Sequence, residues 1–276
     1  MKHITSITLS ITLAISALAP KPVMAQSNLE GRITLSGAFA LYPLAVKWAD
    51  EFKKLHPKVK IDLTAGGAGK GMTDVLNNMV DIGMVSREVY PEEVKKGALG
   101  IAVAKDAVVA VVNSNNPAIK DILSKGMKRE AASNIWISGK YKSWSQAFAT
   151  KTAAPIHVYT RSDACGAAEV WAKYFGKKQE DLLGSGVFGD PGLALAVKKD
   201  PIGIGFNNIG YAYDHNTRKQ VSGITVVPID LNNNGKIDAD ENFYDTMDKI
   251  VDAIYAVRDN GFYYDIDIEK TTLSEE

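Results

Sequence analysis

The sequence predicts an α/β protein built from parallel strands. Short β-rich runs alternate with helical stretches near the start of the chain, an order typical of βαβ units. We expect a strand at 32–35, a helix at 43–55, a strand at 59–65, a helix at 69–79 and a strand at 82–85. The large apolar residues of the first helix recur at spacings of three or four: Leu44, Trp48, Phe52 and Leu55. That spacing predicts an amphipathic helix packed on a core.

A second group of elements begins at the apolar run 107–112, which is typical of a buried strand, and the run 202–206 predicts another short strand. The chain is long enough for one large core or two smaller ones. If both runs cross between two lobes, residues 26–106 and 200–276 form the first lobe and residues 107–199 form the second. We find no tandem repeat and no low-complexity segment.

The first 25 residues predict a signal peptide. Lys2 is followed by an apolar run at 4–19 and by the small-residue stretch Val23-Met24-Ala25, where a signal peptidase would cleave. An uncleaved membrane anchor is the alternative, but this run is shorter than the roughly 20 apolar residues that span a bilayer. Cys165 is the single cysteine, so the exported chain would fold without an internal disulfide. We therefore expect a periplasmic or otherwise exported protein.

The charge balance restricts the possible partners. Without residues 1–25 the chain keeps 30 basic and 32 acidic residues, which is close to neutral. A protein that held nucleic acid or an acidic membrane by its net field would be clearly basic. We therefore expect no nucleic-acid partner, and any anion site must depend on local geometry.

Three segments share a design in which a strand runs into a turn of small residues that opens a helix: 36–42, 66–71 and 161–167. The first turn of a helix presents N–H groups without intrahelical partners, and glycine lets an anion approach them closely. The three turns could converge on one tetrahedral oxyanion, or each could serve only as a turn or cap. The segment 66–71 lacks the spacing of nucleotide-binding glycine loops, which disfavours a nucleotide enzyme.

Five motifs in a fixed order give the chain a resemblance to a known family. They are Ser36-Gly37-Ala38 through Tyr42-Pro43, the turn 66–71, Asp81-Ile82-Gly83-Met84-Val85-Ser86-Arg87, Arg161-x-Asp163, and Gly203-Ile204-Gly205. The sequence resembles the phosphate-binding proteins of bacterial phosphate ABC transporters over nearly the whole chain after residue 25. The resemblance implies a two-lobed periplasmic-binding-protein fold, with crossing hinge strands and phosphate buried in the cleft. It also implies a carrier without catalytic residues, whose partner is an ABC transporter permease.

The resemblance assigns roles to particular residues. The positions that it places around the anion are Leu41, Tyr42, Ala68, Ser86, Arg161, Cys165, Gly166 and Ala167. Leu41 and Tyr42 would offer backbone N–H groups, and the planar fork of Arg161 can give two parallel bonds to one oxyanion. Asp163 would either pair with Arg161 or cap the following helix. Arg87 would either approach the anion or remain solvated.

Several of these positions depart from the family pattern. Members often have Ser or Thr where this chain has Ala68, Cys165 and Ala167. The alanines lack a hydroxyl and a thiol is a weak donor, so backbone amides would supply more of the binding. Some members have Asp where this chain has Ser86, and that carboxylate accepts the proton of hydrogen phosphate and rejects sulfate. Ser86 can donate or accept, which keeps other tetrahedral oxyanions open beside phosphate.

The segment 230–241 matches a calcium-binding loop. Its expected ligands are Asp230, Asn232, Asn234, the carbonyl of Lys236, Asp238 and Glu241. They stand at positions 1, 3, 5, 7, 9 and 12 of the loop, with a glycine at position 6 for the sharp turn. An Asn- and Asp-rich surface loop is the alternative. The preceding run 224–229 predicts a strand instead of the usual entering helix, so we expect calcium to have a structural role and not to open the protein as in a sensor. We expect no organic cofactor.

Two other functions stay open from the residues alone. A hydrolase would use Cys165 as nucleophile and His157 as base, although one cysteine and one histidine form an incomplete site. A calcium-stabilised envelope protein would need only the loop 230–241. Loss of anion binding after alkylation of Cys165 would favour a carrier, whereas loss of turnover would favour the enzyme.

Overall fold

The computed structural model describes residues 29–256. The expected signal peptide and the segment after residue 256 lie outside this range. The first elements along the chain are β1 (Gly31–Gly37), α1 (Tyr42–Leu55), β2 (Val59–Ala65), α2 (Ala68–Leu76), β3 (Ile82–Met84) and α3 (Pro91–Val94). Then come β4 (Val108–Asn113), α4 (Ile119–Lys125), α5 (Arg129–Trp136), α6 (Trp144–Phe148), β5 (His157–Arg161) and α7 (Gly166–Tyr174). The last are η1 (Gln179–Asp181), β6 (Ser185–Val187), α8 (Gly189–Lys199), β7 (Gly203–Asn208), α9 (Ile209–Ala212), β8 (Ile224–Val226) and α10 (Met247–Ala256).

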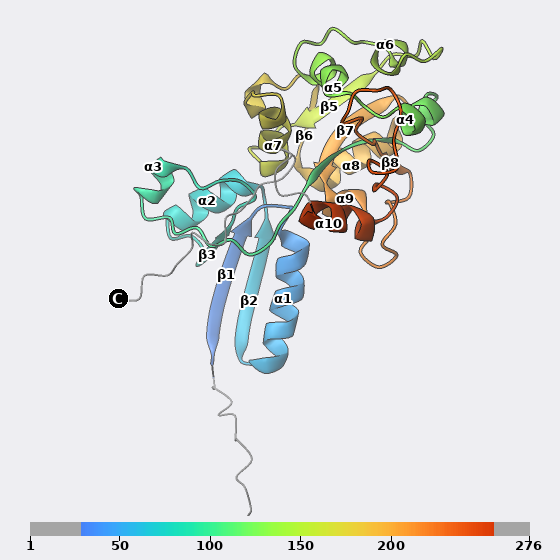
Figure 1. The fold of residues 1–276 in the computed structure, drawn as a ribbon. Coiled ribbons are helices and arrows are strands. Elements are labelled where there is room, and N and C mark those ends of the chain that lie inside the picture. Colours follow the sequence, from blue (N-terminus) through green and yellow to red (C-terminus); the bar gives the residue numbers. More distant parts are fainter. Residues whose placement is uncertain (1–28, 257–276) are drawn as a thin grey trace, which may run out of the picture.

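The elements form two lobes, each with its own sheet (Figure 1). The first lobe has a parallel three-stranded sheet in the order β2-β1-β3, with Gly31 opposite Val59 and Leu35 opposite Ile82. The second lobe has a five-stranded sheet in the order β6-β5-β7-β4-β8. In this sheet β5 is parallel to β6 and β7, whereas β4 is antiparallel to β7 and β8. The α/β class expected from the sequence is therefore confirmed.

The division of the chain between the lobes differs from the expected one. Residues 200–276 were expected in the first lobe, but β7 and β8 are hydrogen-bonded into the five-stranded sheet of the second lobe. The apolar side of α10 also belongs to the second core. The reason is that β7 is buried at every residue and has a strand on each side. Within the described residues, the chain therefore crosses between lobes in the segment 95–107, before β4.

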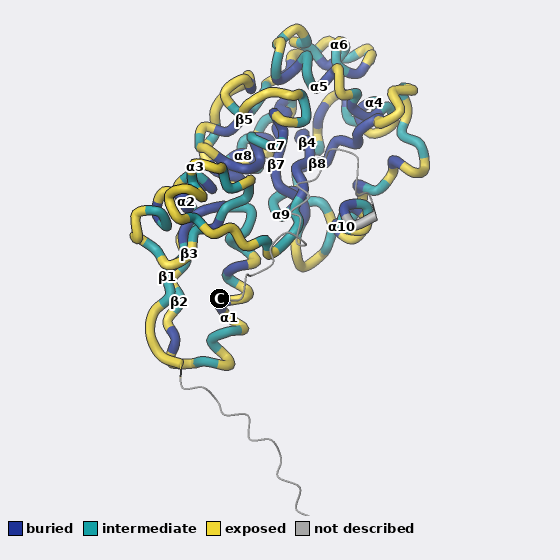
Figure 2. Tube along the Cα trace, turned by 60° about the vertical axis from the view of Figure 1, so that its left-hand side comes forward, coloured by how far each residue is buried: buried dark blue, intermediate teal, exposed yellow. Residues whose placement is uncertain are grey.

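The two lobes have cores of very different size. The second core includes Trp136, Trp171 and Phe206, and the rings of Trp171 and Phe206 stack with centroids 5.7 Å apart. Among the described residues, the buried cluster of the first lobe comprises Ala38, Ala45, Ala68 and Met84. Figure 2 shows this contrast as a continuous buried interior above a lobe that is largely intermediate or exposed.

The packing of α1 corrects the prediction of an apolar stripe turned inward. Ala45 and Ala49 are the buried residues of this helix, whereas Trp48 is 44% and Leu55 65% exposed. The helix contacts β2, and its buried residues are small, whereas Trp48 and Leu55 stay largely exposed. None of the helices within residues 29–256 is long and apolar enough to cross a membrane.

Candidate functional site

Three helices begin where the two lobes meet, and each starts at one of the turns expected from the sequence. Leu41 precedes α1 and Gly67 precedes α2, and neither residue caps its helix with a side chain. Cys165 precedes α7, and its Sγ accepts a hydrogen bond from N of Ala168 at 3.5 Å. Because the first N–H groups of a helix have no intrahelical partner, these three starts bring several backbone donors to one region.

The second and third turns contact each other across the lobe boundary. The N–H of Gly69 donates to the carbonyl of Ala164 at 3.3 Å. Gly67 has φ = 93°, which favours glycine, and a Cβ at this position would lie 3.0 Å from Oδ2 of Asp163. A Cβ on Gly166 would overlap the carbonyl oxygen of Ser86. The glycines of these turns therefore permit backbone from the two lobes to meet without intervening side chains.

Arg161 lies at the C-terminal end of β5, and its side chain is fully buried. Its Nε and Nη2 donate to Oδ1 and Oδ2 of Asp163 at 2.9 and 2.6 Å, and Nη1 donates to Oδ2 of Asp190 at 2.8 Å. Burial lowers the pKa of Arg161, but the hydrogen bond and charge of Asp163 and the charge of Asp190 outweigh it, so the pKa is raised. Asp163 thus pairs with Arg161, and the cap of α7 is Cys165.

The aromatic residue Phe39 covers this arginine from the first lobe. Its ring centroid lies 5.9 Å from Cζ of Arg161, and its ring meets Phe188 edge-on at 5.7 Å. The backbone carbonyl of Phe39 accepts a hydrogen bond from the hydroxyl of Tyr211 in the second lobe at 2.9 Å. Leu41 and Tyr42 lie two and three residues further along the chain, so this contact holds the start of α1 beside the second lobe.

Asp190 is a site residue that the sequence did not reveal. Asn208 Nδ2 donates to its Oδ1 at 2.5 Å, and Asn207 Nδ2 donates to its carbonyl at 2.9 Å. Burial raises the pKa of the Asp190 carboxyl, although Arg161 lowers it. Burial also raises the pKa of Asp106, at the end of the interlobe crossing, to about 7, and the charge of Asp190 adds to this rise. A signal existed in the segment 187–190, because there too a strand runs into a helix that begins at a glycine, Gly189.

Arg87 does not have the solvated role that was one of its two expected roles. Its side chain is 9% exposed, and Nη2 donates to Oε1 of Glu93 at 2.7 Å, so it lies in a largely buried ion pair. Ser86, by contrast, lies against Gly166, as the convergence of the turns requires. Ala68 and Ala167 are buried at the starts of α2 and α7.

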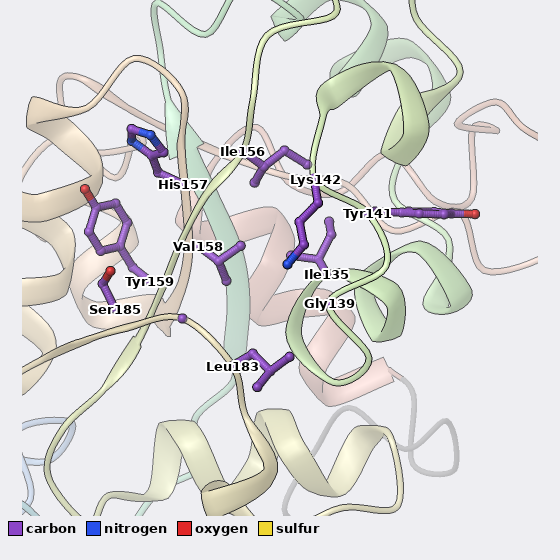
Figure 3. Close-up of a pocket in the computed structure, with 11 residues that line it drawn as sticks. Ile135, Gly139, Tyr141, Lys142, Ile156, His157, Val158, Tyr159, Leu183 and Ser185 are labelled. Carbon is purple, nitrogen blue, oxygen red and sulfur yellow. The ribbon is translucent and has the colours of Figure 1, made fainter.

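The residues of the hydrolase hypothesis are not paired with each other. Nδ1 of His157 lies 2.7 Å from Oδ2 of Asp200. His157 begins β5 and Arg161 ends it, which separates the two by about 13 Å. Burial raises the pKa of the Cys165 thiol to about 12, the opposite of the shift that activates a nucleophile. His157 instead lines a pocket of about 430 Å³ with Lys142, Tyr159 and Ser185, as Figure 3 shows.

The loop 230–241 wraps its backbone around two buried carboxylates. Oδ1 and Oδ2 of Asp230 accept N–H groups of Asn234 and Gly235 at 3.1 and 2.8 Å. Both oxygens of Glu241 also accept backbone N–H groups. Asp238 accepts the side-chain amides of Asn232 and Asn234. Within residues 29–256, no group of three or more His, Cys, Asp or Glu side chains is arranged to hold a metal ion.

Two α/β lobes with backbone turns and a buried arginine at their junction define a two-lobed binding protein. A family model of the PBP superfamily domain matches residues 22–271, and the chain belongs to this family. The two-lobed periplasmic-binding-protein fold inferred from the five motifs is thereby confirmed, but the crossing hinge strands are not: the described chain passes between the lobes through the irregular segment 95–107. The fold is shared with a solved structure from Clostridium perfringens, described as a phosphate ABC transporter substrate-binding protein with bound phosphate. That match has a TM-score of 0.61 and 22% identity, and it covers 72% of this chain and 76% of the other.

The curated relatives support the same family. Protein SphX of Synechococcus elongatus is 28% identical over 242 residues, which cover 82% of this chain and 67% of SphX. Phosphate-binding protein PstS 2 of Streptococcus pneumoniae is 41% identical over 91 residues, 33% of this chain. The matched segment spans 31% of the length of that relative. The resemblance to phosphate-binding proteins, drawn from motifs alone, is confirmed.

Proposed function

We propose that the protein captures inorganic phosphate outside the cytoplasm and delivers it to an ABC transporter permease. The observation that carries this proposal is the meeting of three helix starts, at Leu41, Gly67 and Cys165, beside the buried Arg161. Backbone donors and one guanidinium suit a tetrahedral oxyanion. Residues 1–25 would direct export, and the relatives named for phosphate binding support the choice of ligand.

The carboxylates beside Arg161 favour an oxyanion that carries a proton. Asp163 and Asp190 border the guanidinium from two sides, and a carboxylate accepts a hydrogen bond from hydrogen phosphate or hydrogen arsenate. Sulfate has no proton to donate near neutral pH and would be repelled. In some relatives an aspartate at the position of Ser86 discriminates between hydrogen phosphate and sulfate. In this chain Asp163 and Asp190 could have that role.

Titration calorimetry of the chain from residue 26 with phosphate, arsenate and sulfate tests the proposal. We expect phosphate to bind at least roughly 100-fold more tightly than sulfate, because an unmatched buried carboxylate costs about 2–3 kcal/mol. If only sulfate bound, the proposed ligand would be wrong, and the protein would be a carrier of a different oxyanion. An absence of heat with all three anions, with and without calcium, would favour the calcium-stabilised envelope protein instead.

The protein would act by binding alone, without covalent chemistry. The raised pKa of Cys165 leaves it a thiol near neutral pH, and its Sγ already accepts the N–H of Ala168. The lobes would close around the anion, and the closed form would be the one that the permease recognises. Hydrolytic turnover that disappears with Cys165→Ala would contradict this part of the proposal.

We also propose that the loop 230–241 binds calcium in a structural role. Residues Asp230 and Glu241 are 1% and 2% exposed, and the donors to their carboxylates among the described residues are neutral N–H groups. Buried carboxylates are ordinarily paired with cations or metals, so a divalent cation would complete this loop. Asn233 and Gly235 adopt φ values of 63° and 84°, which form the sharp turn that such a loop requires.

Calcium is expected to raise the melting temperature of the protein by about 5 °C or more at an excess of 100 times the dissociation constant. Glu241→Gln should remove most of this shift, because it replaces the carboxylate at position 12. Asp240→Asn at position 11 is the matched control, since that position supplies no ligand. Differential scanning calorimetry in calcium and in chelator measures the shift, and equal shifts for both variants would contradict the assignment.

A further inference from the structure

The segment that follows β3 holds Tyr90 in one orientation on the first lobe. Arg87 and Glu93 form a double hydrogen bond at 2.9 and 2.7 Å, and the Arg87 guanidinium lies 4.1 Å from the centroid of the Tyr90 ring. Oε2 of Glu93 also accepts the backbone N–H of Tyr90 at 2.8 Å. Both the ring and the backbone of Tyr90 are therefore fixed by the same pair of charged side chains.

The hydroxyl of Tyr90 reaches the second lobe. It donates to Oε2 of Glu169 at 2.9 Å, and the same oxygen lies 3.8 Å from Nε of Arg87. One turn further along α7, Nζ of Lys173 donates to Oε1 of Glu88 at 3.0 Å. Residues four apart lie on one helix face, so α7 presents Glu169 and Lys173 to the segment after β3.

These contacts act on the helix that carries the candidate anion site. Gly166 and Ala167 begin α7, and Glu169 belongs to its first turn. A helix start moves with its first turn, so a bond to Glu169 also fixes the N–H groups of Gly166 and Ala167 against the first lobe. Separation of the lobes would break the Tyr90–Glu169 bond and withdraw Gly166 from Ser86 in the same motion.

We propose that Tyr90 and Glu169 form an interlobe latch that keeps the two lobes closed over the anion site, with Arg87 and Glu93 positioning the tyrosine. Its effect on affinity rests on the proposed function, whereas its effect on lobe closure does not. The latch residues are positioning residues, because they act through α7 and the segment after β3. Since the bond forms only after the lobes meet, the latch chiefly slows dissociation of the anion.

The cross-lobe contacts of the latch region are the Tyr90–Glu169 bond, the Arg87–Glu169 pair at 3.8 Å and the Glu88–Lys173 pair, and they differ in strength. Glu169 has a side chain 23% exposed, and a hydroxyl bonded to a charged acceptor is among the stronger hydrogen bonds. Glu88 and Lys173 each have side chains 61% exposed, so water and salt screen their attraction. The Tyr90–Glu169 bond is therefore the contact to remove.

Tyr90→Phe and Tyr159→Phe form a matched pair of variants that tests the latch. Each removes one hydroxyl that donates to a carboxylate at 2.9 Å, but the acceptor of Tyr159 is Asp200 within the same lobe. Tyr90→Phe should weaken phosphate binding about tenfold, mainly through faster dissociation. It should also enlarge the radius of gyration of the phosphate-free protein in small-angle X-ray scattering. Tyr159→Phe should change the phosphate affinity by no more than about twofold. It should leave the radius of gyration unchanged within error.

A double-mutant cycle identifies the partner. Glu169→Ala should weaken phosphate binding at least as much as Tyr90→Phe, because it also removes the carboxylate that lies 3.8 Å from Nε of Arg87. Adding Tyr90→Phe to Glu169→Ala should then cost little more, since the tyrosine hydroxyl has already lost its acceptor. Additive losses would overturn the pairing. Equal dissociation rates and equal radii of gyration for Tyr90→Phe and Tyr159→Phe would overturn the latch itself. If the unaltered protein bound no phosphate, the proposed function would fail, and the scattering comparison would still decide the latch.

Discussion

Arg161→Ala is expected to weaken phosphate binding by roughly 1,000-fold, the largest effect of any single substitution in the site. Three of the five guanidinium N–H groups bond to Asp163 and Asp190, which leaves two that can donate to an anion. The loss of two charge-assisted bonds in a buried site accounts for about 4 kcal/mol. Titration calorimetry with phosphate measures the loss.

The same substitution should lower stability, because it leaves two carboxylates without their cation. Removal of one partner from a buried ion pair costs about 3–5 kcal/mol. Arg161→Lys separates folding from binding, since it keeps a charge near Asp163 and Asp190 but loses the planar fork. Arg129→Ala is a matched control, because Arg129 bonds to the carbonyl of Tyr174 on an exposed surface. If a folded Arg161→Ala protein bound phosphate with unchanged affinity, the anion site could not lie at Arg161.

Gly166→Ala is expected to weaken phosphate binding by about 10- to 100-fold without unfolding either lobe. The added methyl group would overlap the carbonyl of Ser86, which belongs to the other lobe, so the overlap is relieved by holding the lobes apart. The N–H groups at the start of α7 would then no longer meet those of α2. Phosphate titration and small-angle scattering should both respond, the second by a larger radius of gyration.

Gly210→Ala provides the control for this steric argument. A Cβ on Gly210 would have its nearest neighbour at 3.7 Å, an ordinary contact, and this glycine also lies in a helix. Its phosphate affinity and melting temperature should stay close to those of the unaltered protein. A Gly166→Ala protein that binds as tightly as Gly210→Ala would show that the lobes need not meet at Ser86.

The strands and the turns were predictable from the sequence because their signals are local. The run 59–65 matches β2 at both ends, and the turns before α1, α2 and α7 stand where glycines and small residues placed them. The five motifs were also sufficient to identify the family. Hydrophobic periodicity and turn-forming residues involve only neighbouring positions, so a single sequence is enough to predict strands and turns.

Features that depend on tertiary packing were predicted less well. The strand 203–208 was assigned to the wrong lobe, because an apolar run shows that a strand is buried but not which sheet it joins. Asp190 was missed because its role depends on Arg161, which lies 29 residues away in the chain. Trp48 was expected in a core, yet α1 packs through Ala45 and Ala49. In each case the deciding partner is distant in sequence.

The two carboxylates that flank Arg161 also determine how the anion arrives. The cluster of Arg161, Asp163 and Asp190 carries no net positive charge whether Asp190 is ionised or protonated. Approaching phosphate would therefore meet no long-range attraction from this cluster, which would not accelerate its encounter with the site. Attraction begins only when the anion is close enough to meet individual N–H dipoles, well within one Debye length, where dissolved salt screens little. If phosphate is the ligand, we therefore expect the rate of its capture to fall little as the salt concentration rises.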